Sequence, residues 1–220
     1  MYQTILFDLD GTLTDSGQGI LNSVAYALEK MGIEEPDTAN LNRFIGPPLY
    51  ESFSRFYQLS PEDTQSAVDA FRVYFKEKGM FENQLYPGII PLLEELRTAG
   101  KTLVIATSKP EIFAKQILEH FGIAHYFDVI AGASLDSSRI SKADVISYAI
   151  NQLEAYPNHA VMIGDREHDI EGARKHQLPA IGVLYGYGNK QEFEKAGATM
   201  IVETVQDLKR ILLTTESSRD

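Results

Sequence analysis

The spacing of hydrophobic positions changes twice along the chain. Residues 5–13 begin as a continuous apolar run and end in a glycine turn, which is typical of a buried strand. From 14 to 84 the apolar residues recur at helical spacing, and from 85 onward helical stretches alternate with short apolar runs. The pattern therefore predicts an all-helical segment inserted between a first strand and an alternating α/β region.

Local signals predict three helices in the helical segment. The first runs from about residue 17 and is stopped by Gly32. The second follows the turn at Pro47-Pro48, and the third begins at Pro61, directly after the capping residue Ser60. An inserted helical unit of this kind is a candidate lid.

The alternating region predicts a parallel sheet, because uninterrupted apolar strands separated by helices are buried on both faces. The predicted strands are 102–107, 127–131, 160–164, 180–184 and 199–202, and the predicted helices are about 89–99, 112–122, 142–153, 170–176 and 205–213. We expect a doubly wound α/β core of residues 1–14 and 85–213, a helical cap of residues 15–84, and a flexible tail, 214–220, which has no apolar residue.

Composition narrows the possible partners. The net charge is −11 and no run of Lys and Arg occurs, which argues against binding to a nucleic-acid polymer. No apolar run is long enough to span a membrane, and the chain enters its first strand at once, so we expect a cytoplasmic protein without a signal peptide. The sequence leaves the oligomeric state open.

The absence of cysteine excludes disulfides and thiolate metal sites, and leaves oxygen atoms as the ligands for a metal. Ligands of parallel α/β sheets bind beyond the carboxyl ends of the strands, so the polar residues there should meet. These are Asp8, Asp10, Thr107, Ser108, Lys142, Asp165 and Asp169. Several neighbouring carboxylates require a cation, and Mg²⁺ prefers such ligands. Together with a lysine and hydroxyls, they favour phosphoryl chemistry with a carboxylate as nucleophile.

These residues resemble, in order and spacing, the four motifs of the haloacid dehalogenase superfamily of phosphatases. The motifs are Asp8-Leu-Asp-Gly-Thr-Leu13, Thr107-Ser108, Lys142 and Gly164-Asp165-x-x-x-Asp169. Two further segments, 44–49 and 181–188, resemble the branch that comprises phosphoglycolate phosphatases and 5′-nucleotidases. The resemblance spans nearly the whole chain and implies a helical cap after the first strand.

The resemblance also implies roles for single residues. Asp8 would attack phosphorus and become an aspartyl-phosphate, and Asp10 would protonate the leaving alcohol and then take a proton from water. Thr107, with Ser108, would hold phosphoryl oxygens, and Lys142 would balance the charge of Asp8 and the phosphate.

For the metal, the resemblance implies Mg²⁺ held by the carboxylates of Asp8 and Asp165 and the backbone carbonyl of Asp10. Asp169 would orient these ligands or Lys142. The chain departs from phosphoglycolate phosphatases at Arg166, where a small residue is usual.

We expect the substrate to be a small phosphate ester, and the Arg166 departure favours nucleoside 5′-monophosphates over phosphoglycolate. Arg43, beside the glycine-proline turn, is the candidate for binding the non-phosphate end. A sugar phosphomutase, whose cap would shield the aspartyl-phosphate from water, and a non-catalytic regulator are the alternatives. For Lys109, the loop position is compatible with either a site contact or exposure to solvent.

Overall fold

The computed structural model describes residues 2–35, 37–136, 138–155, 157 and 159–214. The predicted tail, 214–220, lies outside the described residues except for Thr214. The chain separates into two compact units: one contains Met1–Thr14 and the chain from Leu85 onward, and the other is Asp15–Gln84. We call them the core unit and the inserted unit, and each is described by itself.

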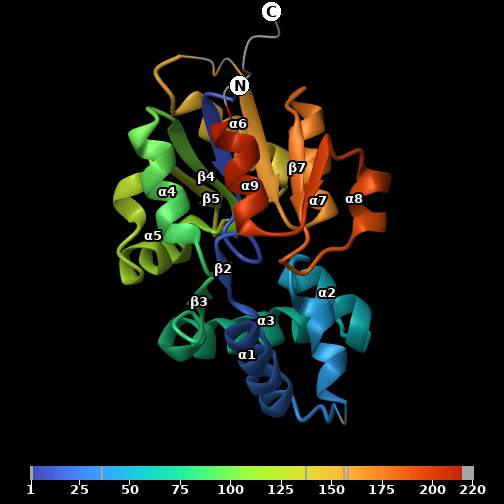
Figure 1. The fold of residues 1–220 in the computed structure, drawn as a ribbon. Coiled ribbons are helices and arrows are strands. Elements are labelled where there is room, and N and C mark those ends of the chain that lie inside the picture. Colours follow the sequence, from blue (N-terminus) through green and yellow to red (C-terminus); the bar gives the residue numbers. More distant parts are fainter. Residues whose placement is uncertain (1, 36, 137, 156, 158, 215–220) are drawn as a thin grey trace, which may run out of the picture. The chain divides into compact units, whose positions relative to one another are not determined.

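A six-stranded parallel sheet forms the centre of the core unit (Figure 1). Its strands are β1 (Thr4–Phe7), β4 (Thr102–Pro110), β5 (Val129–Ala133), β6 (Ala160–Gly164), β7 (Ala180–Val183) and β8 (Met200–Val202). Their order is β5-β4-β1-β6-β7-β8, so the chain builds one side of β1 first and then the other. The predicted doubly wound α/β fold is confirmed. The reversal places a topological switch point beyond the carboxyl end of β1, where such folds bind ligands.

Helices cover both faces of this sheet. They are α4 (Ile89–Thr98), α5 (Glu111–His120), α6 (Lys142–Asn151), α7 (Glu167–Lys175), α8 (Lys190–Ala196) and α9 (Val205–Leu213). Helices α4 and α9 pack together in front of the sheet in Figure 1. On the opposite face, Leu6 and Met162 of the sheet pack with Ile146 of α6 and Phe193 of α8. Each such buried side chain contributes roughly 1.5–3 kcal/mol to folding.

The core unit differs from the sequence prediction in several places, of which helix α8 and strands β5 and β4 are the clearest. Helix α8 has only two buried residues, Phe193 and Ala196, so its apolar signal is too short to detect. Strand β5 lies two residues later than the predicted 127–131. Strand β4 continues to Pro110, with a register shift between Thr107 and Pro110 against β5.

The inserted unit contains the three predicted helices: α1 (Gly17–Lys30), α2 (Leu49–Tyr57) and α3 (Pro61–Tyr74). As expected, Ser60 caps α3, where its side chain accepts a hydrogen bond from the backbone N–H of Asp63 at 3.1 Å. Two helical turns were not predicted: a 3₁₀ helix, η1 (Thr38–Phe44), and a π-helical turn, η2 (Phe75–Gly79). The inserted segment is also not purely helical, because β2 (Thr14–Asp15) and β3 (Gln84–Leu85) pair as a short sheet where the chain passes between the units.

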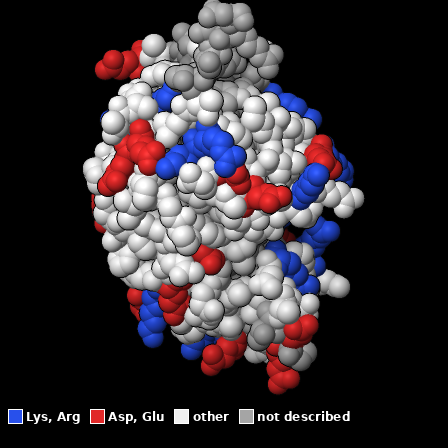
Figure 2. Space-filling model, viewed as in Figure 1, with Lys and Arg blue, Asp and Glu red and all other residues white. Residues whose placement is uncertain are grey.

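Acidic and basic side chains are interspersed on the surface seen in Figure 2. In the part of the chain that the structure describes, no helix is both long and apolar enough to cross a membrane.

Candidate active site

The carboxyl ends of the central strands bring most of the predicted site residues together in the core unit. Asp8 directly follows β1, and its backbone N–H donates to the carbonyl of Ile163 in β6 at 2.9 Å. Thr107 lies in β4, Asp165 directly follows β6, and Lys142 begins α6. All four side chains come from residues at most 8 % exposed. The site is therefore formed by buried residues in or directly after the central strands and at the start of α6.

Lys142 is held at the centre of this arrangement. Its Nζ lies 2.8 Å from Oδ1 of Asp8 and 2.7 Å from Oδ1 of Asp169, and it donates to the carbonyl of Ala106 at 3.0 Å. Burial alone would lower the pKa of Lys142, but the carboxylates of Asp169 and Asp8 outweigh burial and raise its pKa above the ordinary value. The ammonium group is therefore charged at any physiological pH.

A third carboxylate, that of Asp165, lies close to the two that pair with Lys142. Oxygens of Asp8, Asp165 and Asp169 all lie within 4.8 Å of one another. Burial, followed by the charges of Asp169 and Asp8, raises the pKa of Asp165 well above its usual value. Burial likewise raises the pKa of Asp169 to about 6, although Lys142 opposes the shift. The negative charge exceeds the positive charge, which is the condition that a bound cation relieves.

The surroundings of Asp165 fit a metal ion. Its Oδ2 accepts a hydrogen bond from the backbone N–H of Tyr187 at 2.9 Å, whereas its Oδ1 is buried and accepts none among the described residues. Gly11 has a φ of +78°, and a Cβ there would lie 2.0 Å from Oδ2 of Asp165. A Cβ at Gly186 would lie 2.3 Å from the carbonyl of Gly11. Backbone without side chains thus encloses Asp165, and the oxygen-only ligands suit a hard divalent cation.

Asp10 lies outside the three-carboxylate cluster and has a partner that the motifs do not identify. Its Oδ2 lies 2.9 Å from Nζ of Lys109, and the two side chains are only 18 % and 7 % exposed. The sequence left open whether Lys109 contacts the site or is exposed to solvent. In the structure it contacts Asp10. The only sequence signal for this contact is a lysine two residues after Thr107. The register shift of β4 between Thr107 and Pro110, which the sequence does not predict, surrounds this lysine.

Two further predicted residues are Ser108, in the core unit, and Arg43, in the inserted unit. Ser108 is exposed, whereas Thr107 is buried and its Oγ1 accepts a hydrogen bond from the backbone N–H of Lys109 at 3.2 Å. Arg43 belongs to the inserted unit, where its Nη2 lies 3.6 Å from Oε2 of Glu35. Its guanidinium also stacks over the ring of Phe56, 4.3 Å from the ring centre.

Comparison with known proteins decides the family. A model of the haloacid dehalogenase-like hydrolases matches residues 5–183. This range includes Lys109 and the predicted site residues of the core unit, which are Asp8, Asp10, Thr107, Ser108, Lys142, Asp165 and Asp169. The chain belongs to the haloacid dehalogenase-like hydrolase family. The family, the fold and the class of enzyme predicted from the motifs, a phosphoric monoester hydrolase, are thereby confirmed.

Three relatives illustrate the range within this family. The crystal structure of a predicted phosphatase from Clostridium acetobutylicum is 52 % identical and has a TM-score of 0.92, covering 97 % of this chain and 99 % of that one. A 5′-nucleotidase of Pseudomonas aeruginosa is 41 % identical over 96 % of both chains. The tyrosine-protein kinase PtkA of Mycobacterium tuberculosis is 43 % identical over 96 % of this chain and 72 % of its own.

In this haloacid dehalogenase-like hydrolase, the residue after Asp165 forms an ion pair. Nε of Arg166 donates to Oε1 of Glu192 at 2.9 Å, and the backbone N–H of Glu167 donates to the same oxygen at 2.7 Å. Glu192 therefore joins the start of α8 to the start of α7. The loop between β7 and α8 carries the Tyr187 N–H that holds Asp165. Sequence patterns miss Glu192 because they miss α8.

Proposed function

We propose that the chain is a Mg²⁺-dependent phosphomonoesterase that works through an aspartyl-phosphate on Asp8 and prefers nucleoside 5′-monophosphates. The observation that carries the proposal is the position of the Asp8 carboxylate, 2.8 Å from the ammonium of Lys142 and within the same cluster as Asp165. A carboxylate held beside fixed positive charge at a strand end is suited to attack an electron-poor phosphorus atom.

The reaction proceeds in two displacements. In the first, an oxygen of Asp8 bonds to phosphorus, the bond from phosphorus to the leaving oxygen breaks, and that oxygen takes a proton from Asp10. In the second, a water oxygen bonds to phosphorus, Asp10 takes a proton from this water, and the bond from Asp8 to phosphorus breaks. Free phosphate, an alcohol and the original carboxylates result.

Other residues hold the phosphoryl group during both steps. Thr107, Ser108 and Lys142 bind its oxygens, with Lys142 offsetting negative charge through its buried ammonium. The Asp8 and Asp165 carboxylates and the Asp10 carbonyl would hold the cation, which when bound supplies charge that offsets the phosphoryl oxygens. Asp169 orients Lys142, to which it is paired at 2.7 Å.

The preference for nucleotides is supported by the 41 % identity to a 5′-nucleotidase and by Arg166, which replaces a small residue usual in phosphoglycolate phosphatases. The inserted unit is the cap in this proposal, and Arg43 contacts the non-phosphate end of the substrate.

Hydrolysis of p-nitrophenyl phosphate tests the chemical part of the proposal. We expect phosphate release that requires Mg²⁺ and falls about a thousandfold or more in Asp8→Asn, because the amide cannot attack phosphorus. Asp69→Asn, an exposed carboxylate on α3, is the matched control and should retain full activity. Full activity in Asp8→Asn would overturn the proposal.

A panel of esters tests the substrate. We expect kcat/KM to be higher for AMP than for phosphoglycolate, and the reverse order would reassign the substrate. Conversion of a sugar phosphate without release of free phosphate would instead support the phosphomutase alternative.

The relationship to PtkA supports a second candidate, the transfer of phosphate from ATP to a tyrosine. Incubation with γ-labelled ATP and Mg²⁺ separates the two candidates. We expect no acid-stable label on tyrosine, and such a label would establish the kinase reaction.

A further inference from the structure

Lys109 and Asp10 form a nearly buried ion pair that joins the ends of two neighbouring strands. Nζ of Lys109 lies 2.9 Å from Oδ2 of Asp10, and the lysine side chain is 7 % exposed. Burying a long side chain and its charge costs free energy unless a defined partner holds it. The pair is therefore a built feature of the site rather than a surface contact.

The backbone of β4 is shaped to deliver Lys109 to this position. The register shift between Thr107 and Pro110 lies around Lys109, and such irregularities re-aim side chains near active sites. The N–H of Lys109 donates to Oγ1 of Thr107 at 3.2 Å, which fixes the turn of the chain. On the neighbouring strand, a Cβ at Gly132 would lie 2.6 Å from the carbonyl of Lys109, so only glycine allows this approach.

The pair makes the two oxygens of Asp10 different. Oδ2 is engaged by Lys109. Oδ1 is buried and has no hydrogen-bond partner among the described residues. A carboxylate that exchanges protons with a substrate needs one oxygen held and one free, and Asp10 has this arrangement.

We propose that Lys109 is a positioning residue for Asp10, holding Oδ2 so that Oδ1 exchanges protons with the leaving group and with water. The inference rests on the phosphatase reaction proposed above and adds one residue to it. In the first displacement the O–H bond at Oδ1 breaks and its proton goes to the leaving oxygen as the phosphorus bond breaks. In the second, Oδ1 regains a proton from the attacking water.

Dependence on the leaving group follows from this role. The leaving group of p-nitrophenyl phosphate is the weakly basic p-nitrophenolate ion, which departs without needing a proton. An ester with a more basic leaving group, such as phenyl phosphate or AMP, needs the proton from Asp10. Loss of Lys109 should therefore slow phenyl phosphate and AMP much more than p-nitrophenyl phosphate.

The test compares kcat/KM of the full chain with Mg²⁺ for these three esters, because kcat/KM covers the step in which the leaving group departs. In Lys109→Met we expect a loss of about tenfold to a hundredfold for phenyl phosphate and AMP and of less than about threefold for p-nitrophenyl phosphate. Lys109→Arg keeps a cation beside Oδ2 and should restore most of the loss. Lys115→Met removes an exposed lysine of α5 by the same substitution and should change none of the three values.

The outcomes separate the two proposals. If the unmodified chain hydrolyses none of the esters, the phosphatase proposal fails. If it hydrolyses them and Lys109→Met slows all three equally, or slows none, the role of Lys109 is overturned while the phosphatase proposal stands. Equal loss together with a lower Tm that Lys109→Arg does not rescue identifies a purely structural role and also overturns the inference.

Discussion

Lys142 in the core unit and Arg43 in the inserted unit both contact acidic groups, but the balance of charge around them differs. In the core unit, the 4 % exposed side chain of Lys142 pairs with two carboxylates, and a third, Asp165, lies in the same cluster. In the inserted unit, the 36 % exposed side chain of Arg43 pairs with Glu35 and stacks on an aromatic ring. The first arrangement has an excess of buried negative charge, and the second is balanced.

This difference in charge balance distinguishes a cluster suited to bind a ligand from contacts that stabilise the fold. An excess of buried charge costs stability unless a ligand relieves it, so the core-unit cluster has the charge of a site that binds a cation. The balanced contacts of Arg43 stabilise the inserted unit without any ligand. If Arg43 also binds substrate, it must give up its contacts to Glu35 and Phe56 to do so. Substitution of Arg43 should therefore lower activity less than substitution of Lys142.

The largest effect is expected from Lys142→Met. It leaves Asp8 and Asp169 without a cation, so the metal-free protein should lose about 3–5 kcal/mol of stability, and activity should fall at least about a hundredfold. Urea unfolding and phosphate release measure the two losses.

A second substitution sharpens this prediction. Adding Asp169→Asn to Lys142→Met removes one uncompensated carboxylate, so part of the stability should return while activity should not. Lys195→Met, an exposed lysine of α8, is the matched control. Recovery of activity in the double variant would show that Lys142 serves packing alone.

The second prediction concerns pH in the absence of metal. The pKa of Asp169 is raised to about 6 in the folded state from 3.8, so between these values the folded state binds more protons than the unfolded state and stability falls as pH rises. The loss amounts to about 1.4 kcal/mol per pH unit for one group.

The contribution of Asp169 is isolated by comparing the original chain with Asp169→Asn in urea unfolding at several pH values with a chelator present. In Asp169→Asn, the free energy of unfolding should not show the fall between pH 3.8 and about 6 that Asp169 causes in the original chain. Added Mg²⁺ should raise the Tm of the original chain more at neutral than at acid pH. A decline that is equal in both proteins would contradict the assignment.

A smaller effect is expected from Glu192→Gln. The neutral amide weakens the contacts to Arg166 and to the N–H of Glu167, and so loosens the loop whose Tyr187 N–H holds Asp165. We expect Mg²⁺ affinity to fall about tenfold, measured by titration calorimetry. Glu194→Gln, on the same helix and 60 % exposed, should leave the affinity unchanged.

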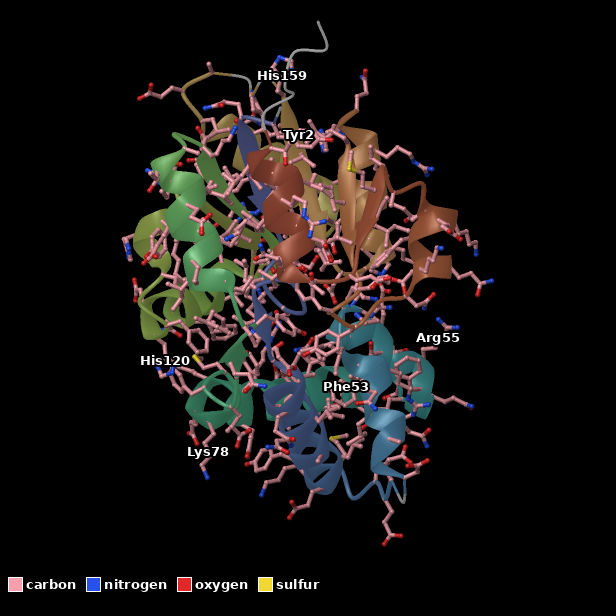
Figure 3. All side chains as sticks on the ribbon, viewed as in Figure 1. Tyr2, Phe53, Arg55, Lys78, His120 and His159 are labelled. Atoms are coloured by element: carbon pink, nitrogen blue, oxygen red, sulfur yellow. The ribbon has the colours of Figure 1, made fainter. Side chains whose placement is uncertain are left out.

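The smallest effect is expected in the inserted unit. Arg43→Ala should lower the ratio of kcat/KM for AMP to that for p-nitrophenyl phosphate by up to about fivefold, because one exposed ionic contact contributes about 0.2–1 kcal/mol. Arg55→Ala is the matched control: Phe53 and Arg55 both lie on α2 (Figure 3), but Phe53 is buried and Arg55 is exposed. An unchanged ratio in Arg43→Ala would limit Arg43 to packing.

Most elements are predictable because their signals are local. Apolar runs mark the sheet strands, and Ser60 and Pro61 mark the start of α3. Helix α8 escapes prediction because its periodicity spans seven residues, although Asn189 followed three residues later by Glu192 is a capping signal that could have revealed it.

The amino-acid sequence by itself determined the motif residues and, through the parallel fold, that they meet at one edge of a sheet. Strand periodicity and the switch-point rule suffice for that conclusion, because both depend on residues near one another in the chain. Thus Asp8, Thr107, Lys142 and Asp165 follow from the pattern of residues alone.

Tertiary structure alone decided two of the charge pairs. The Lys109–Asp10 contact depends on a register shift in β4 and a glycine on β5, and the Arg166–Glu192 contact joins the starts of two helices. The partners are up to 99 residues apart. Pairing over such separations depends on ångström-level backbone placement, which no local pattern of residues encodes.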